Sequence, residues 1–174
     1  MMSNIMVDLE TMSTQPNAAI VAIGAVKFGS KGLTEEFYAS VDLETSVKTG
    51  GHIDPKTVMW WMNQSVEARG ELIGFDGSLF TALQDFSKFV GAKKEAKIWG
   101  NGASFDNVVL GCAYDSVNLT RPWNFWNDRC YRTMKNMFSN GIEYVEPDIK
   151  HHALEDAKAQ ALHLCRIMQA IQKG

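Results

Sequence analysis

The N-terminal segment NIMVDLET has the alternating pattern of a half-buried β-strand. Ile5, Val7 and Leu9 fall on one face of that strand, and Asp8 and Glu10 fall on the other, because successive strand side chains point in opposite directions. Two more runs follow after short links, the unbroken apolar run AAIVAIGAVKF and then LTEEFYASV. We therefore expect an antiparallel meander with strands at residues 4–11, 18–28 and 33–41.

Helical periodicity replaces the strand pattern after this meander. Asp54 and Pro55 are typical of a helix start, and they predict a helix over residues 55–69. Apolar residues at spacings of three and four predict a second helix over residues 78–90. The remaining elements that we expect are a short strand within 96–102, a helix at 106–117, a strand end and a helix within 123–138, and a last helix from Ala153 almost to the C-terminus.

The composition is that of an ordinary globular protein. Of the 174 residues, 45% are apolar and 21% are charged, and no repeat, low-complexity tract or linker divides the chain. We therefore expect a single α/β domain over residues 1–174. The net charge of −3 argues against binding nucleic acid through bulk positive charge, although it allows a grip on a few phosphates through bound metal.

The cysteine content and the N-terminal sequence indicate the cellular compartment of the protein. Three widely spaced cysteines without a CxxC pair argue against a disulfide framework or a cysteine zinc site. The N-terminus lacks the basic segment of a signal peptide, and no apolar run reaches the length of a membrane span. These features predict a cytoplasmic protein without membrane contact.

Four acids in separate segments are the candidate chemistry. Asp8 and Glu10 share one strand face, with Cα atoms roughly 6.6 Å apart at about 3.3 Å per residue, so both can reach one ion. Asp106 falls in the first turn of a predicted helix, for which Ser104 is a candidate N-cap. Asp156 lies in the last helix beside a face of alanines that lets the helix approach the sheet, which desolvates a carboxylate. Taken singly, each acid has an ordinary structural explanation.

Convergence of these acids would require cations. Two carboxylates 4 Å apart repel by about 4 kcal/mol at an effective dielectric constant near 20, so four of them together need divalent ions. Oxygen-only ligation favours Mg²⁺ or Mn²⁺ over zinc. If the four acids converge, they form a two-metal site for phosphoryl transfer.

Three segments resemble the motifs of the DEDD exonuclease superfamily: VDLET, NGASFDN and HHALEDA. The resemblance covers nearly the whole chain, with the motifs in the expected order. It implies an RNase H-like fold, with a mixed five-stranded sheet (an antiparallel meander, then parallel strands) flanked by helices. It also implies removal of nucleotides from a 3′ end with two metal ions. The histidine-bearing branch carries its histidine five positions before the last aspartate, which selects His151 and leaves His152 as a neighbour.

More narrowly, VDLETMSTQPNAAIVAIGAVKF, TVMWWMNQS and WGNGASFDN are similar to phage and prophage 3′–5′ exonucleases of the DexA type and to a mycobacterial exoribonuclease. By position, the resemblance implies that Asp8 bridges both metals, while Glu10 and Asp156 complete the site that holds the attacking water. Asp106 acts through the water shell of the second metal. His151 takes the proton from the attacking water, although a loop histidine exposed to solvent is the ordinary alternative.

Residues beside these motifs are candidates for substrate contacts. Leu9, Thr11 and Phe105 adjoin the acids, although Leu9 and Phe105 are equally suited to the core. Trp60 and Trp61 point about 100° apart on a helix, so we expect one in the core and the other, Trp61, in a cleft where it can stack on a base.

The segment NDRCYRT offers further candidates for phosphate contacts. These are Arg129 and Arg132, and we expect at least one of them to be an ordinary solvated surface residue.

Two alternatives remain. Pro147-Asp148 followed by Asp156-Ala-Lys158 matches in outline the PD…(D/E)xK pattern of lambda-type exonucleases, but that pattern needs its D-x-K on a strand. A non-catalytic nucleic-acid-binding module on the same fold is the other alternative, which the full set of acids disfavours. The partners that we expect are single-stranded 3′ ends in the cytoplasm of a bacterium or a phage-infected host. Phage-like similarity favours DNA over RNA, and relatives allow a homodimer.

Overall fold

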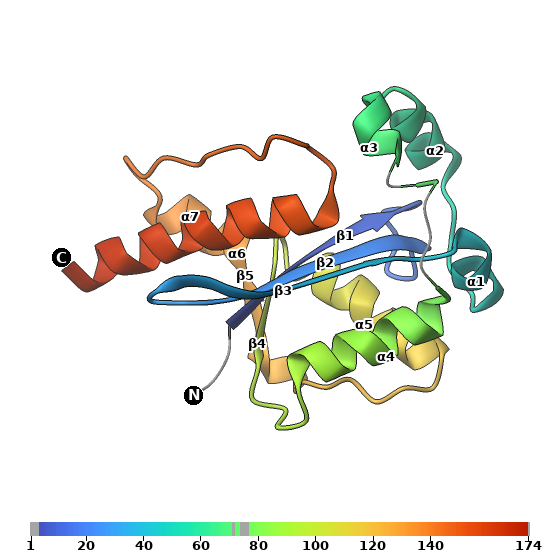
Figure 1. Cartoon of the computed structure of the whole chain (residues 1–174), viewed down its shortest axis with the longest axis horizontal. Coiled ribbons are helices and arrows are strands. Elements are labelled where there is room, and N and C mark those ends of the chain that lie inside the picture. Colours follow the sequence, from blue (N-terminus) through green and yellow to red (C-terminus); the bar gives the residue numbers. More distant parts are fainter. Residues whose placement is uncertain (1–3, 71, 74–76, 174) are drawn as a thin grey trace.

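The computed structural model describes residues 4–70, 72–73 and 77–173, so residues 1–3, 71, 74–76 and 174 of the expected domain lie outside the described residues. Within these ranges, one mixed sheet has the strand order β3-β2-β1-β4-β5 (Figure 1). The strands are β1 (Asn4–Thr11), β2 (Ile20–Gly29), β3 (Gly32–Ser40), β4 (Lys97–Gly100) and β5 (Asp128–Cys130). The helices are α1 (Leu43–Lys48), α2 (Pro55–Met62), α3 (Val66–Gly70), α4 (Leu79–Val90), α5 (Asp106–Ser116), the 3-10 helix η1 (Phe125–Asn127), α6 (Tyr131–Phe138) and α7 (Ala153–Lys173).

The strand pairing confirms the predicted meander. β1 pairs antiparallel with β2, and β2 pairs antiparallel with β3. β4 runs parallel to β1, and β5 runs parallel to β4. The C-terminal ends of β1, β4 and β5 therefore meet at one edge of the sheet.

The alternation that the sequence predicts for β1 is confirmed, and it divides the side chains of the strand between two cores. Ile5, Val7 and Leu9 point into the core that α4 and α5 cover. Met6 points into a second core, on the opposite face of the sheet, which includes residues of α7. Figure 1 shows α7 on one side of the sheet and α4 with α5 on the other. Asp8 and Glu10 thereby emerge on the face that α7 covers.

Helix α7 packs so closely against β2 that the backbones of the two elements are in contact. A Cβ atom at Gly24 would lie 2.1 Å from the carbonyl carbon of Ala153. Ala153, Ala157 and Ala161 are fully buried, which confirms the alanine face that the sequence predicts. This contact holds the first turn of α7, with Asp156, against the sheet.

We expect Gly24→Ala to destabilise the protein by about 1–3 kcal/mol or more, because the added methyl group meets backbone that cannot rotate away. Gly29→Ala on the same strand is the matched control, since a Cβ there meets nothing within 4 Å. We expect the control to change the free energy of unfolding by about 0.5 kcal/mol or less. Denaturant unfolding of both variants measures the difference. Equal losses would show that the close approach of α7 does not limit position 24.

The prediction of one helix over residues 55–69 is wrong in one respect, because two helices, α2 and α3, occupy this range. The side-chain amides of Asn63 and Gln64 donate to the carbonyls four residues earlier, which ends α2. The Ser65 hydroxyl then accepts the N–H of Ala68 and starts α3. Helix α1 was not predicted either, since its six residues are too few to show a periodicity.

In the part of the chain that the structure describes, no helix combines the length and the apolar character of a membrane span. The 21-residue helix α7 carries charged residues such as Lys158 and Arg166 along its length.

Candidate active site

The four predicted acids meet at the sheet edge where β1 and β4 end. Asp8 and Glu10 lie on β1, Asp106 is the first residue of α5, and Asp156 lies in the first turn of α7. Glu10 and Asp106 are 7% and 4% exposed, and the other two are half-buried. The prediction that Ser104 caps α5 is wrong, because Phe105 occupies the N-cap and no side chain caps this helix.

Asp106 is held by backbone groups from two neighbouring segments. The backbone N–H groups of Leu9, of Asn101 and of Asp106 itself lower the pKa of its carboxyl, against the larger effect of burial. The start of α5 therefore lies close to β1 and to the loop after β4. Gly100 makes room for this arrangement, since a Cβ there would lie 2.9 Å from the Cβ of Asp106.

Burial raises the pKa of three of the four acids, and neighbouring charge adds to this effect at Asp8. Burial raises the pKa of Asp8 well above its ordinary value, and the negative charges of Asp106, Glu10 and Asp156 raise it further. Burial raises the pKa of Asp106 to about 7, and it also raises the pKa of Asp156. The cluster therefore resists full ionisation near neutral pH unless positive charge enters it.

The donor atoms of the cluster fit a divalent cation. Glu10, His151 and Asp156 present ligand atoms that all lie within 4.8 Å of one another. Asp8 lies close enough to Asp106, Glu10 and Asp156 for their charges to raise its pKa. Hard oxygen donors with one imidazole nearby suit Mg²⁺ or Mn²⁺.

His151 faces the acids, and His152 packs elsewhere. His151 has a left-handed backbone (φ 61°), and its backbone N–H donates to Asp156 Oδ2 at 2.9 Å. Its imidazole packs edge-on against Trp60, with ring centroids 4.8 Å apart. The ring of His152 lies against Tyr38 of β3, with centroids 5.0 Å apart. The loop before α7 thus places His151, and not its neighbour, among the metal-binding candidates.

Gln160 is a site residue that the sequence pattern did not lead us to expect. It is 3% exposed, and its Nε2 donates to Asp8 Oδ1 at 2.9 Å. The sequence feature that could have revealed Gln160 is its spacing from Asp156. Residues four apart on a helix share a face, and Gln160 follows Asp156 by four. This hydrogen bond fixes the orientation of the Asp8 carboxylate.

We expect Gln160→Ala to lower kcat about 10- to 100-fold and to weaken Mn²⁺ binding, as is usual when a residue that orients a metal ligand is lost. Gln160→Glu should be worse, because it places another carboxylate against Asp8. Steady-state kinetics and an Mn²⁺ titration measure both effects. Gln169→Ala, further along α7, is the control, since Gln169 only reaches the Ser30 carbonyl at 3.4 Å. Equal kinetics for Gln160→Ala and this control would contradict the orienting role.

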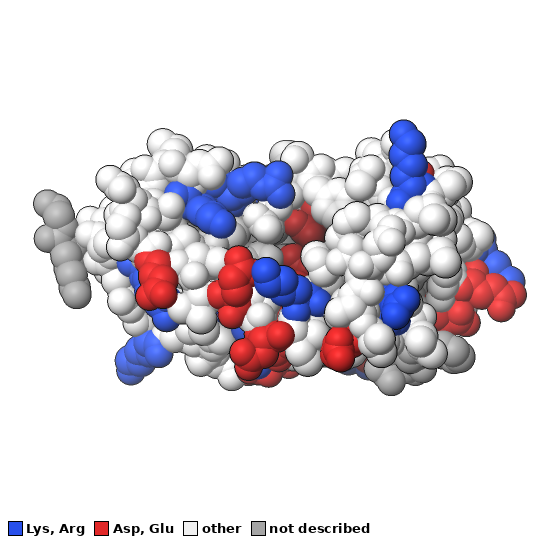
Figure 2. Space-filling model, turned by 90° about the horizontal axis from the view of Figure 1, so that it is seen from above, with Lys and Arg blue, Asp and Glu red and all other residues white. Residues whose placement is uncertain are grey.

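A cleft of about 510 Å³ opens beside the acids. Its walls include all four predicted substrate contacts: Leu9, Thr11, Trp61 and Phe105. Its volume lies in the range of small-molecule sites. Figure 2 shows acidic side chains in a hollow of the surface, with basic side chains along its border. The structure therefore brings the predicted contacts together in one place, and their binding role stays a prediction.

The two tryptophans divide between core and surface as expected, but in the opposite sense, because Trp61 belongs to a buried cluster and Trp60 is exposed, although both contribute to the cleft wall. Trp61 is only 2% exposed, and its Nε1 donates to the Thr11 carbonyl at 3.0 Å. Trp60 is 43% exposed and packs against Trp61 and His151. Trp60 thus offers the larger open surface, while Trp61 fixes the wall beneath it.

Residues 3–168 match the family described as the Rv2179c-like 3′–5′ exoribonuclease domain. The chain belongs to this family. It is also 26% identical to the exodeoxyribonuclease of Enterobacteria phage T4, over 76% of this chain and 70% of the phage protein. Family membership confirms the predicted 3′–5′ exonuclease class.

Solved exonuclease structures share the fold of this family member. The nuclease domain of 3′hExo, a DEDDh family member bound to rAMP, matches with a TM-score of 0.63 and 13% identity, over 97% of this chain and 92% of that domain. E. coli exonuclease I in complex with a dT13 oligonucleotide matches with a TM-score of 0.62 and 15% identity, over 99% of this chain. The chain spans only 41% of exonuclease I. These matches confirm the RNase H-like sheet.

The PD…(D/E)xK alternative does not fit this exonuclease family member. Asp156 and Lys158 lie on α7 and not on a strand. The Lys158 ammonium pairs with Glu155 at 3.1 Å and with Glu36 at 3.6 Å. Lys158 is therefore engaged outside the acid cluster.

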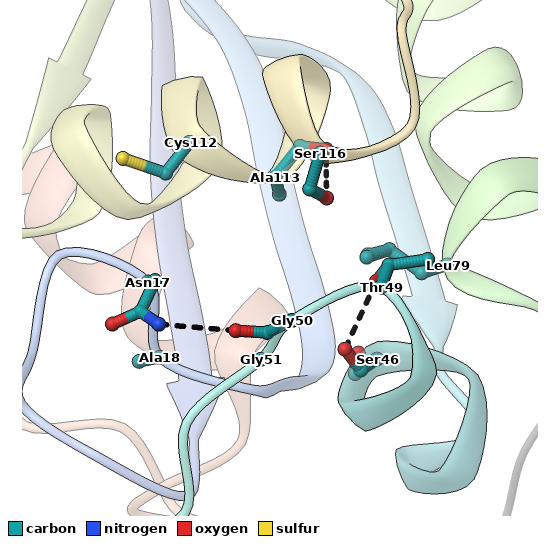
Figure 3. Close-up of a pocket in the computed structure, with 10 residues that line it drawn as sticks. All are labelled: Asn17, Ala18, Ser46, Thr49, Gly50, Gly51, Leu79, Cys112, Ala113 and Ser116. Atoms are coloured by element: carbon teal, nitrogen blue, oxygen red, sulfur yellow. Dashed lines mark hydrogen bonds between the residues drawn. The ribbon is translucent and has the colours of Figure 1, made fainter.

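A second, much smaller cavity of about 30 Å³ lies between α1 and α5 (Figure 3). Its wall contains mostly small side chains and backbone, with the Asn17 amide donating to the Gly50 carbonyl at 3.0 Å. It has room for about one water molecule. We assign it to packing and not to the exonuclease site.

Proposed function

We propose that residues 1–174 form a single, divalent-metal-dependent 3′–5′ exonuclease domain that hydrolyses phosphodiester bonds at single-stranded 3′ ends, with DNA preferred. The convergence of four acids with His151 beside an aromatic-walled cleft is the observation that carries this proposal. Family membership supports the reaction class.

Each acid has a separate role in holding two Mg²⁺ or Mn²⁺ ions. Asp8 would supply ligand atoms to both ions, and Gln160 keeps its carboxylate in place. Glu10 and Asp156 would complete the metal site beside the attacking water, and Asp106 would assist in holding the second ion. When bound, the two ions supply charge stabilisation for the transition state and for the leaving 3′ oxygen.

His151 serves as the general base. Its ring stands against Trp60, and its backbone N–H is tied to Asp156, so the imidazole is held beside the carboxylates. A ring nitrogen of His151 takes the proton from the attacking water, which raises the nucleophilicity of its oxygen. Trp60, Trp61, Phe105 and Leu9 form the apolar walls that receive the terminal nucleotide.

The preference for DNA rests on the phage T4 relative, which is an exodeoxyribonuclease. Exonuclease I bound to a dT13 oligonucleotide supports the same choice. The family description instead names an exoribonuclease, so RNA hydrolysis at the same site is the second candidate. Discrimination depends on how the cleft receives the 2′ position of the terminal sugar.

The deciding experiment incubates the parent and Asp156→Asn with 5′-labelled single-stranded DNA and RNA in Mn²⁺, with and without a chelator. We expect a ladder of shortening labelled products that disappears with the chelator and in the variant, with DNA cut faster. Equal degradation by the variant would overturn the site. If the parent protein binds the strands without cutting them, the result would favour the alternative of a non-catalytic nucleic-acid-binding module.

A further inference from the structure

Arg132 places a positive charge beside the acid cluster. It lies in the first turn of α6, directly after β5, at the sheet edge where the acids meet. Its guanidinium donates to the Asn101 carbonyl at 2.7 Å and attracts the Asp106 carboxylate. The side chain is exposed. A cation that is anchored at one nitrogen and open to solvent can still bind an incoming anion.

The loop between β4 and α5 leaves space against this guanidinium. Gly102 has a φ of 120°, and a Cβ there would lie 3.7 Å from Arg132 Cζ and 3.8 Å from Ser104 Oγ. The guanidinium and the Ser104 hydroxyl therefore both lie near a backbone position without a side chain. Among the described residues, no acid comes within ion-pair distance of Arg132. An Arg fork beside a hydroxyl is well suited to phosphate oxygens.

Arg129, the other arginine of the same segment, is bound differently. Its Nη1 donates to the backbone carbonyls of Trp126 and Asp128, both at 2.9 Å. These bonds tie its guanidinium to the segment that enters β5, whereas Arg132 follows the end of that strand. The structure thus separates two residues that the sequence presents as equivalent candidates.

The cleft and Arg132 lie on different sides of the acids. The cleft is built from β1 and α2, and Arg132 is on α6. Figure 1 shows α2 and α6 on opposite sides of the first turn of α7, which carries Asp156. A strand whose terminal nucleotide occupies the cleft would cross the acids and continue toward α6.

We propose that Arg132, with the Ser104 hydroxyl, binds a backbone phosphate of the substrate strand on the 5′ side of the scissile bond. The inference rests on the proposed function, because it takes the cleft as the place of the terminal nucleotide. A chain with a net charge of −3 and an acidic centre repels a polyanion, so a local cation contact contributes to holding the strand. Phosphate contacts position a strand without reading its sequence.

The first test measures affinity and its dependence on salt. Arg132→Ala and Arg129→Ala, matched in charge, are compared in an Asp156→Asn background by fluorescence anisotropy with labelled single-stranded DNA. We expect Arg132→Ala to weaken binding about tenfold and to reduce the slope of log K against log salt by about 0.7, the value for one phosphate of a single strand. We expect Arg129→Ala to change affinity less than about twofold. Equal effects of the two variants would overturn the proposal.

The second test locates the phosphate. A set of strands carries one neutral methylphosphonate each, placed at successive positions from the 3′ end. We expect the Asp156→Asn protein to bind one strand of this set about tenfold more weakly than the unmodified strand. Arg132→Ala should lose that penalty, and a penalty that persists in Arg132→Ala would overturn the assignment. Arg132→Gln, which retains a donor for Asn101, replaces Arg132→Ala if the alanine variant does not fold. Cleavage by the parent is scored separately, so a failed exonuclease assay refutes the proposed function and not this contact.

Discussion

Replacing Asp8 with asparagine is expected to abolish hydrolysis and to stabilise the metal-free protein. Asp8 is the proposed bridging ligand, and the bound ions contribute several kcal/mol of charge stabilisation to the transition state. Since about 1.4 kcal/mol corresponds to a factor of ten, kcat should fall at least about a thousandfold. Single-turnover cleavage of labelled DNA in Mn²⁺ measures the loss.

The gain in stability follows from the charge that the substitution removes. Burial and three neighbouring acids raise the pKa of Asp8, so the folded state disfavours its ionised form. A carboxyl whose folded pKa is raised makes the protein lose stability as pH rises from its unfolded value, near 3.9, through its folded value. Asparagine has the same shape and no charge, and it retains an oxygen for the Gln160 amide.

We therefore expect the melting temperature of Asp8→Asn in chelator to exceed that of the parent by about 3 °C at pH 8, with a smaller difference as the pH falls toward 4. Adding Mn²⁺ should raise the melting temperature of the parent and leave the variant nearly unchanged. Asp148→Asn, at an exposed acid outside the cluster, is the control and should match the parent. A variant less stable than the parent in chelator at pH 8 would refute the electrostatic account.

Replacing His151 with alanine is expected to lower kcat about 10²- to 10⁴-fold, the usual contribution of a general base. His152→Ala is the matched control, because the ring of His152 packs against Tyr38 of β3. We expect this substitution to lower kcat less than about tenfold. Cleavage rates at saturating DNA and Mn²⁺ give the comparison. A larger loss in His152→Ala than in His151→Ala would reverse the assignment.

The same pair of variants separates two roles of His151. Its ring nitrogen lies within 4.8 Å of the Glu10 and Asp156 ligand atoms, so it has the position of a metal ligand as well as of a base. If His151 acts only as a base, its replacement leaves the thermal stabilisation by Mn²⁺ intact. If His151 is a metal ligand, its replacement removes much of that stabilisation. We expect the melting shift of His151→Ala with Mn²⁺ to stay close to that of the parent.

Local periodicity predicted the parts of the site that lie within single elements. A period of two placed Asp8 and Glu10 on one face of β1, and the alanines of α7 indicated a close contact with the sheet. Both are consequences of local geometry, and the structure confirms them. The motif order then selected Asp106 and His151, which local geometry alone did not connect to the other acids.

Contacts between distant segments were beyond that kind of inference. The hydrogen bond from Gln160 to Asp8 depends on how α7 lies across the sheet. The burial of Trp61 depends on the Thr11 carbonyl that its indole reaches. The Arg132 guanidinium reaches the Asn101 carbonyl, which lies in a separate loop. In each case the partner is set by tertiary packing, which no single segment encodes.

The fit of Ala153 against Gly24 also sets the time at which this nuclease can act. Gln160 and Asp8 are 152 positions apart, so their synthesis is separated by about 8–30 seconds at about 5–20 residues per second. Until α7 emerges and settles on β2, the acids of β1 have neither Asp156 nor the Gln160 amide. We therefore expect a nascent chain that still lacks α7 to be inactive, because the acid cluster needs β1 and α7 together.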